Sequence, residues 1–249
     1  MPVEPKLAAT VILLREREPD LESDDNCEFE VFMAKRHENA RFMSEHHVFP
    51  GGGIDEQDLI KESRARLLGI DENVIKNLKE ICEDPANLWI IAIREVFEET
   101  GILIATNEKG NSLGKIEENT RKLKKHQRNL QKKRKTMTDI LTKENLYYAA
   151  NNLKYFGRLI TPAISPIRFD TQFFLCKLPQ KQKINLFKDE LKESLWGTPG
   201  KLLDLFKNNH IKIIFPQFST LNRLKKFKTI QEAFLNSKNA FRITRLPDF

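Results

Sequence analysis

Ala92-Ile93-Arg94-Glu95-Val96-Phe97-Glu98-Glu99-Thr100-Gly101-Ile102 is the most informative stretch of this chain. On a helix, Glu95, Glu98 and Glu99 stand at positions i, i+3 and i+4, so their carboxylates share one face. Apolar residues fall on the opposite side and can pack into a core: Trp89, Ile90, Ile93, Val96 and Phe97. The pattern therefore predicts an amphipathic helix that carries three acidic groups.

The ends of this helix are also predicted from the sequence. Asp84 is suited to the N-cap and Pro85 to the first helical position. Gly101 is suited to the left-handed residue that follows a helix, so we expect the helix to run to Thr100. A strand over Ile102–Ala105 should follow it.

Three carboxylates this close repel one another unless cations neutralise them. Hard oxygen ligands of this kind suit Mg²⁺ or Mn²⁺. A solvated acidic face is the commoner explanation of an isolated E-x-x-E-E pattern. Here Arg94 precedes the cluster, and upstream Val48-Phe49-Pro50-Gly51-Gly52-Gly53 forms a glycine turn whose backbone can approach a ligand closely. This context favours a metal site.

The rest of the chain mixes strands with helices. Short runs rich in β-branched and aromatic residues predict strands, and Val74, Ile75, Leu78, Ile81 and Cys82 lie at helical spacing within 59–83. We expect a loop over 16–26, a helix over 201–208, and strands over 6–15, 29–36, 153–160, 169–177 and 211–215. There is too little βαβ alternation for a doubly wound sheet, so we expect an α/β protein with a mixed sheet covered by helices.

Composition excludes several classes of protein. Of 249 residues, 40% are hydrophobic and 31% charged, which is enough apolar material for a hydrophobic core. The sequence contains no run of 18 apolar residues, so we expect no transmembrane helix. The N-terminal residues 1–6 do not resemble a signal peptide. Three widely spaced cysteines, Cys27, Cys82 and Cys176, argue against a disulfide framework or structural zinc, and suggest the cytoplasm.

The net charge of +7 comes from one segment. Residues 115–143 contain eleven Lys or Arg and three Asp or Glu, so the remainder is close to neutral. This segment is expected to form one or two surface helices. It admits two interpretations, a solvated helical face or a patch that attracts an anionic substrate, RNA or a membrane. Because it lacks interleaved aromatic residues, base stacking is not indicated and RNA binding is not favoured.

Residues 94–102 resemble the second half of the Nudix box, R-E-U-x-E-E-x-G-U with U apolar, at every specified position. The first half, G-x5-E, resembles Gly52 through Asp58, with aspartate in place of glutamate. Arg94 follows Gly52 by 42 positions instead of the usual 14, so the box is split by 28 inserted residues.

The split box resembles the coenzyme A diphosphatase-like branch called Nudix motif 19. Further segments are similar to that branch: 159–162, 168–175, 190–199 and 215–218. The resemblance implies a Nudix-type α/β/α sandwich with a mixed β-sheet. We expect a single domain over residues 1–249, with helical insertions at about 59–84 and 106–150.

The resemblance also implies roles for the site residues. Glu98 and Glu99 would be metal ligands, and Glu95 would ligate metal or act as general base. Arg94 would hold the cluster in position through charge-assisted hydrogen bonds. The carbonyl of Gly51 would be a further ligand. The expected cofactor is Mg²⁺ or Mn²⁺, and the expected reaction is hydrolysis of a nucleoside diphosphate linked to another group.

Candidate substrate contacts are Arg36, Gly52 and Asp170. Arg36 ends a strand and either reaches a substrate phosphate or is an ordinary surface arginine. Asp170 either pairs with Arg168 or lines the pocket. Glu190 and Glu193 either act late in the site or are exposed loop carboxylates.

Coenzyme A or an acyl derivative, cleaved to 3′,5′-ADP and a phosphopantetheine, is the substrate that the branch implies. ADP-ribose, a dinucleotide such as NADH and a nucleoside triphosphate are alternatives within the enzyme class. An RNA-binding or decapping protein and a non-catalytic nucleotide-binding regulator are alternatives outside it. The chain ends Leu246-Pro247-Asp248-Phe249, unlike the peroxisomal tripeptide common in that branch, so we expect a cytoplasmic location. The sequence does not indicate an oligomeric state.

Overall fold

The computed structural model describes residues 3–18, 26–40, 43–110, 113, 120–237 and 241–243, the last three by backbone only. Most of the loop predicted over 16–26 lies outside these residues, as do Lys115 and the end of the chain at 246–249. Among the described residues, no helix combines the length and the apolar character that crossing a bilayer requires.

A mixed sheet forms the centre of the fold, with its strands in the order β10-β2-β1-β9-β8-β11. Strands β1 and β9 are parallel, as are β8 and β11, whereas β2 runs antiparallel to β1 and to β10, and β9 antiparallel to β8. Short strands β3 and β4 pair with β2 and β1. The bounds are β1 Lys6–Glu16, β2 Phe29–Arg36, β3 His47–Val48, β4 Gly51–Gly53, β8 Leu153–Ile160, β9 Phe169–Lys177, β10 Leu191–Gly197 and β11 Phe241–Ile243.

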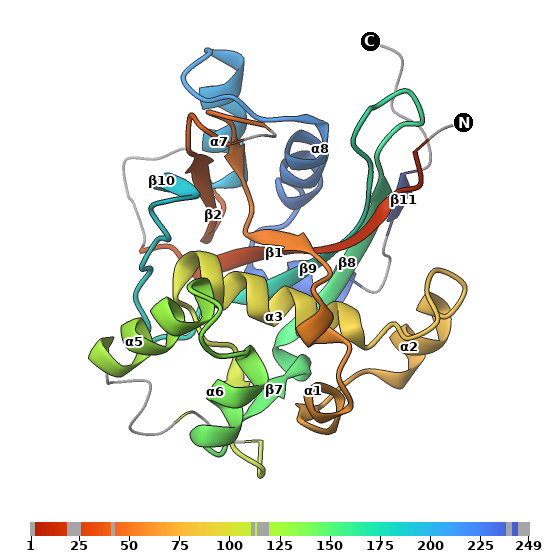
Figure 1. The fold of residues 1–249 in the computed structure, drawn as a ribbon. Helices are drawn as coiled ribbons and strands as arrows, with labels where there is room; N and C mark the ends of the chain where they lie inside the picture. Colours follow the sequence, from red (N-terminus) through yellow and green to blue (C-terminus); the bar gives the residue numbers. More distant parts are fainter. Residues whose placement is uncertain are drawn as a thin grey trace.

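Helices cover both faces of this sheet (Figure 1). Side chains alternate along β1, so Val11 and Leu13 face a core that includes α3 (Asn87–Thr100), whereas Ile12 and Leu14 face the other. That second core is closed by α7 (Pro199–Lys207), α8 (Phe215–Leu224) and α9 (Ile230–Asn236). The predicted mixed sheet between two helical layers is confirmed.

The two predicted insertions fold against each other below α3 in Figure 1. The first contains η1, α1, β5 and α2, and the second contains β6, α5, α6, β7 and η2. Strand β7 joins them, because it pairs with β5 on one side and with β6 on the other. Their bounds are η1 Glu56–Asp58, α1 Lys61–Ala65, β5 Leu67–Leu68, α2 Glu72–Leu78, β6 Ala105–Thr106, α5 Thr120–Gln131, α6 Met137–Lys143, β7 Tyr147–Ala149 and η2 Ala150–Asn152.

The helix with the glutamates begins later than predicted. Its N-cap is Ala86 rather than Asp84, and it ends as expected at Gly101, which takes a φ of 72°. The Asp84 carboxylate pairs instead with Arg64 at 3.2 Å. The backbone carbonyls of Asp84 and Pro85 accept the amides of Asn87 and Leu88, so a tighter turn leads into the helix.

Two predicted strands are wrong in whole or in part. The strand over 102–105 is reduced to Ala105–Thr106, because the side chain of buried Gln182 accepts the Leu103 amide at 2.7 Å and donates to its carbonyl at 2.9 Å. No strand forms over 211–215, since Phe215 and Pro216 start α8. The strands predicted over 6–15, 29–36, 153–160 and 169–177 and the helix over 201–208 are confirmed to within two residues.

Candidate active site

The three glutamates of α3 lie against the glycine strand β4. Glu99 is almost fully buried, and its carboxylate accepts the backbone amide of Gly51 at 3.0 Å. Glu95 lies so close to Gly52 that a Cβ added there would stand 2.5 Å from its carboxylate oxygen. A side chain at 52 would therefore displace the Glu95 carboxylate, whereas a Cβ added at Gly51 would stand 2.5 Å from the backbone carbonyl oxygen of Ala9. Gly51 and Gly52 lie beside these glutamates, but Gly51 bonds Glu99 through its amide, and ligation by its carbonyl stays a prediction.

Arg94 is the cation that organises these carboxylates. Its Nε and Nη2 donate to the two oxygens of Asp58 at 2.8 and 2.9 Å, and Nη2 also donates to the Gly53 carbonyl at 2.9 Å. Its Nη1 lies 2.7 Å from Glu95 and 3.3 Å from Glu98. Burial alone would lower the pKa of this guanidinium, but the charges of Glu95 and Asp58 outweigh burial and raise it.

Asp58, the aspartate in the first half of the box, is the bidentate partner of Arg94. It is 1% exposed and ends the single turn η1, where its carboxylate also accepts the Asp55 amide at 2.8 Å. Asp55 in turn caps the amide of Gln57, which makes a reciprocal capping box. Asp58 and Arg94 are therefore 36 positions apart in sequence, and the fold brings them into hydrogen-bond contact.

The cluster holds more negative charge than its described neighbours neutralise. Burial raises the pKa of Glu95 to about 7, assisted by the charge of Glu98 and opposed by Arg94. Burial also raises the pKa of Glu98, and it raises the pKa of Glu99 well above its usual range together with the charges of Glu95 and Glu190. Each carboxyl thus retains its proton more readily than in water, because burial and neighbouring carboxylates both disfavour its charged form.

Arg36 and Glu190 border the cluster. The charge of Arg36 lowers the pKa of Glu99, and its Nε is buried without a hydrogen-bond partner among the described residues. Glu190 is exposed, yet its charge raises the pKa of both Glu98 and Glu99. The sequence offered Glu190 as one of two acidic candidates, and its neighbours Phe187 and Leu191 gave no signal that it lies beside α3.

Asp170 is bonded elsewhere. Its two oxygens accept Nε and Nη2 of Arg158 at 2.8 and 2.6 Å, and one also accepts Gln172. Arg158 rather than Arg168 is therefore its ion-pair partner, and Arg168 bonds the carbonyls of Thr161 and Val3. A substrate contact by Asp170 stays a prediction.

The second insertion clamps the last turn of α3. Gln127 and Gln131 of α5 both donate to the Glu98 carbonyl, at 3.0 and 2.8 Å, and Gln127 also exchanges hydrogen bonds with Asn185. The amides of Asn185 and Phe187 donate to the carbonyls of Thr100 and Glu99. Carbonyls that a helix end leaves open are thus satisfied by the insertion and by a loop. This clamp was not predicted, because two glutamines in a lysine-rich helix carry no distinctive pattern.

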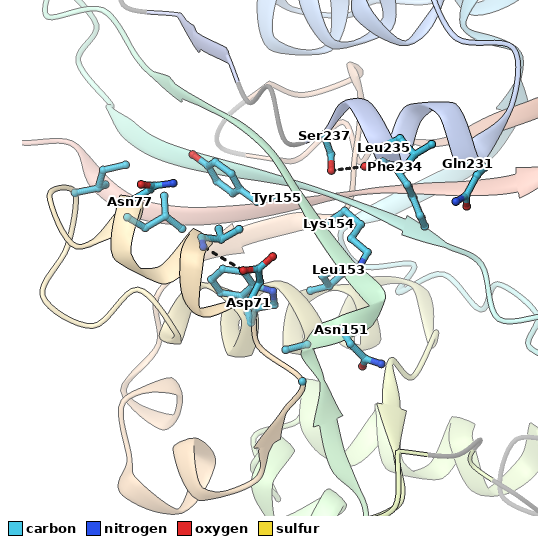
Figure 2. Close-up of a pocket in the computed structure, with 16 residues that line it drawn as sticks. Asp71, Asn77, Asn151, Leu153, Lys154, Tyr155, Gln231, Phe234, Leu235 and Ser237 are labelled. Atoms are coloured by element: carbon cyan, nitrogen blue, oxygen red, sulfur yellow. Dashed lines mark hydrogen bonds between the residues drawn. The ribbon is translucent and has the colours of Figure 1, made fainter.

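A cavity of about 510 Å³ lies away from the glutamates. Figure 2 shows its lining, with Lys154 and Tyr155 from β8, Asp71 and Asn77 from the α2 region, and Phe234 from α9. It reaches Trp89 near the start of α3, whereas Glu98 lies on the opposite side of that helix and two and a half turns along it. The carboxylate chemistry and this cavity are therefore separate features.

The donor set fits a hard divalent cation. The glutamate carboxylates have raised pKa values and lie beside the glycine residues of β4. Oxygen ligands of this kind are those that Mg²⁺ and Mn²⁺ prefer. Among the described residues, no three acidic, imidazole or thiol groups already converge on one point. Glu95 and Glu98 lean toward Arg94 and Glu99 toward Gly51, so ion binding would require these side chains to turn.

Comparison with known proteins relates this chain to a family. A family model for the NUDT19 Nudix domain matches residues 61–224. The chain is 29% identical over 241 residues to the acyl-coenzyme A diphosphatase NUDT19 of Xenopus laevis, covering 85% of this chain and 63% of that protein. It is 25% identical over 246 residues to the protein of the same name from Gallus gallus, covering 83% of this chain and 64% of that protein. The chain thus spans less than two thirds of the length of these curated relatives.

The fold has a solved counterpart. The crystal structure of a Nudix hydrolase from Alicyclobacillus acidocaldarius superposes with a TM-score of 0.71 at 24% identity, covering 93% of this chain and 96% of that one. This likeness confirms the predicted α/β sandwich of the Nudix type.

Glu95→Gln is expected to stabilise the metal-free protein in a pH-dependent way. The folded pKa of about 7 exceeds the ordinary 4.5, so the wild type loses stability as pH rises between these values and does not regain it above 7. Urea unfolding in a chelator at pH 5 and pH 8 should show the advantage of the variant growing by on the order of 2 kcal/mol. Glu83→Gln, an exposed site outside the cluster, is the control. An advantage equal at both pH values would contradict the account.

The two clamp glutamines should differ in their effect on stability. Gln127→Leu leaves the backbone carbonyl and the side-chain amide of half-buried Asn185 without the partner they share, which should cost about 2 kcal/mol. Gln131→Leu should cost less, since the Glu98 carbonyl keeps Gln127. Urea unfolding of both variants measures this, and equal costs would show that the Asn185 bonds contribute nothing.

Proposed function

The chain belongs to the NUDT19 Nudix domain family, and on that premise we propose that it hydrolyses a diphosphate linkage with Mg²⁺ or Mn²⁺ as cofactor. We propose coenzyme A or acyl-coenzyme A as the substrate, cleaved to 3′,5′-ADP and a phosphopantetheine, a choice supported by the acyl-coenzyme A diphosphatases that it resembles. The observation that carries the proposal is the cluster of glutamates beside the glycine strand β4, whose negative charge exceeds the positive charge of its described neighbours. A cytoplasmic location stays a prediction.

In this proposal the glutamates of α3 hold the divalent cation. Glu98 and Glu99 are its ligands, and the carbonyl of Gly51 is a further one. The ion, when bound, neutralises the diphosphate and makes a bound water more acidic. Glu95 is a ligand or accepts the proton of the attacking water.

Other residues bind and orient. Arg94 holds Glu95 and Glu98 on one side of α3 through Nη1, while Asp58 holds its other two nitrogens. Arg36 has an unpartnered Nε beside Glu99 and is assigned to a substrate phosphate, as Arg binds phosphate well. Gly52 presents bare backbone to the substrate. Asp170, whose carboxylate accepts from Arg158 and Gln172, is a further proposed substrate contact.

Cleavage assays across a panel of phosphate anhydrides test this function. The panel contains coenzyme A, acyl-coenzyme A, ADP-ribose, NADH, nucleoside triphosphates and capped RNA, each with Mg²⁺ and with Mn²⁺. Metal-dependent cleavage of coenzyme A or its acyl derivative is expected to exceed that of the other substrates. Glu98→Gln should lower kcat by roughly 100-fold or more, because an under-neutralised ligand is lost.

The exposed Glu83→Gln serves as the matched control and should retain full activity. Preferred cleavage of another panel member would contradict the substrate assignment. Nucleotide binding without cleavage of any substrate would contradict the enzyme proposal and favour a nucleotide-binding regulator.

A further inference from the structure

The positive charge of the protein is concentrated on α5 and the turn that follows it. Residues 120–135 hold nine of the 42 Lys and Arg and none of the 35 Asp and Glu, so the remainder of the chain has a net charge of −2. Lys122 pairs with Glu144. The other eight are exposed and form no ion pair with a described residue: Arg121, Lys124, Lys125, Arg128, Lys132, Lys133, Arg134 and Lys135.

These cations are displayed on a fixed surface. Leu123, His126, Gln127 and Leu130 form the buried stripe by which α5 docks on the rest of the protein. Backbone hydrogen bonds from the amides of Lys132, Lys133 and Arg134 hold the turn. Because this buried stripe already packs against the rest of the protein, α5 cannot insert it into a membrane. Only the basic face of the helix is available for binding. Like charges crowded in this way repel one another, and a bound anionic surface would relieve that repulsion.

Exposed aliphatic side chains lie beside this basic turn. Ile60 and Lys135 line the same surface hollow, together with Glu62 and Lys143. Leu59 is 55% exposed and Ile60 38%. The Gln57 side chain accepts the Met137 amide at 3.1 Å and so ties η1 to the start of α6. Ile60 and Lys135 therefore border one hollow at the end of the basic segment. We give the name basic–aliphatic surface to residues 59–60 together with the eight exposed cations of 121–135.

We propose that the basic–aliphatic surface docks this protein on anionic lipid bilayers. The cations contact lipid phosphates and carboxylates, and Leu59 and Ile60 enter the interface. Each Lys or Arg near an anionic membrane contributes about 1 kcal/mol of binding free energy. Nucleic acid is the less favoured polyanion, because residues 120–135 contain no Phe, Tyr or Trp on which bases could stack, and exposed aliphatics add nothing to phosphate contacts. This inference does not depend on the proposed catalytic function.

Vesicle sedimentation tests the proposal. The whole protein is mixed with vesicles of phosphatidylcholine alone or of phosphatidylcholine with phosphatidylserine. Binding is expected only to the second kind, with a strong decline as salt is raised. Neutralising the turn with Lys132→Gln, Lys133→Gln, Arg134→Gln and Lys135→Gln together should lower the partition coefficient by about 100-fold or more. Leu59→Gln should lower it several-fold.

A charge-matched control separates a local surface from net charge. Lys201, Lys207, Lys225 and Lys226 are exposed on the layer of α7 and α8, and their joint replacement by Gln changes the net charge by the same amount. This variant should retain most of the binding. All replaced side chains are exposed, and thermal unfolding verifies that each variant is folded.

Three results would overturn the proposal. The wild type fails to bind the anionic vesicles, the two charge-matched variants lose binding equally, or the protein binds single-stranded RNA homopolymer more tightly than the anionic vesicles in the same buffer. The last result would assign the surface to nucleic acid.

Discussion

The buried ion pair between Arg94 and Asp58 is the interaction on which the site depends. Four groups meet at one guanidinium: the Asp58 carboxylate, the Gly53 carbonyl, Glu95 and Glu98. The arginine is 3% exposed and the aspartate 1%, so removal of either would leave a buried charge without its partner. Such a loss costs about 3–5 kcal/mol, and here it would also release the glutamates.

Both insertions support this ion pair rather than standing apart from it. Ser63 donates to the carbonyl of Gln57, one residue before Asp58, and bonds Thr138 of the second insertion. Met137 donates to the side chain of Gln57. From the other side, Gln127 and Gln131 hold the end of the glutamate helix. Residues of the two predicted insertions therefore contact both halves of the split box, near Asp58 and at the end of α3. The basic face of α5 is the outer surface of the second of these segments.

The sequence predicted the parts of the site that follow from local pattern. The glutamate face and the Gly101 end of the helix depend on spacing within a few residues, and the structure has them. The predicted glycine turn is wrong for Gly51–Gly53, which form the short strand β4 paired with β1. Partners distant in sequence were not readable in the same way. Asp58 meets Arg94 across 36 positions, and Gln182 takes the backbone of Leu103 across 79, which removes most of a predicted strand. Asp84 is a residue type that favours the N-cap position of a helix. In the structure its carboxylate forms an ion pair with Arg64 instead.

The central claim is that Arg94 and Asp58 arrange under-neutralised glutamates to hold a divalent cation. Titration of Mn²⁺ followed by electron paramagnetic resonance, on the wild type, Asp58→Asn and the exposed control Glu83→Gln, tests it most directly. The account predicts Mn²⁺ binding by the wild type and the control, and affinity roughly 10–100-fold lower in Asp58→Asn, although Asp58 is not assigned as a ligand. Equal affinity in folded Asp58→Asn and wild type, or no binding by the wild type, would contradict it.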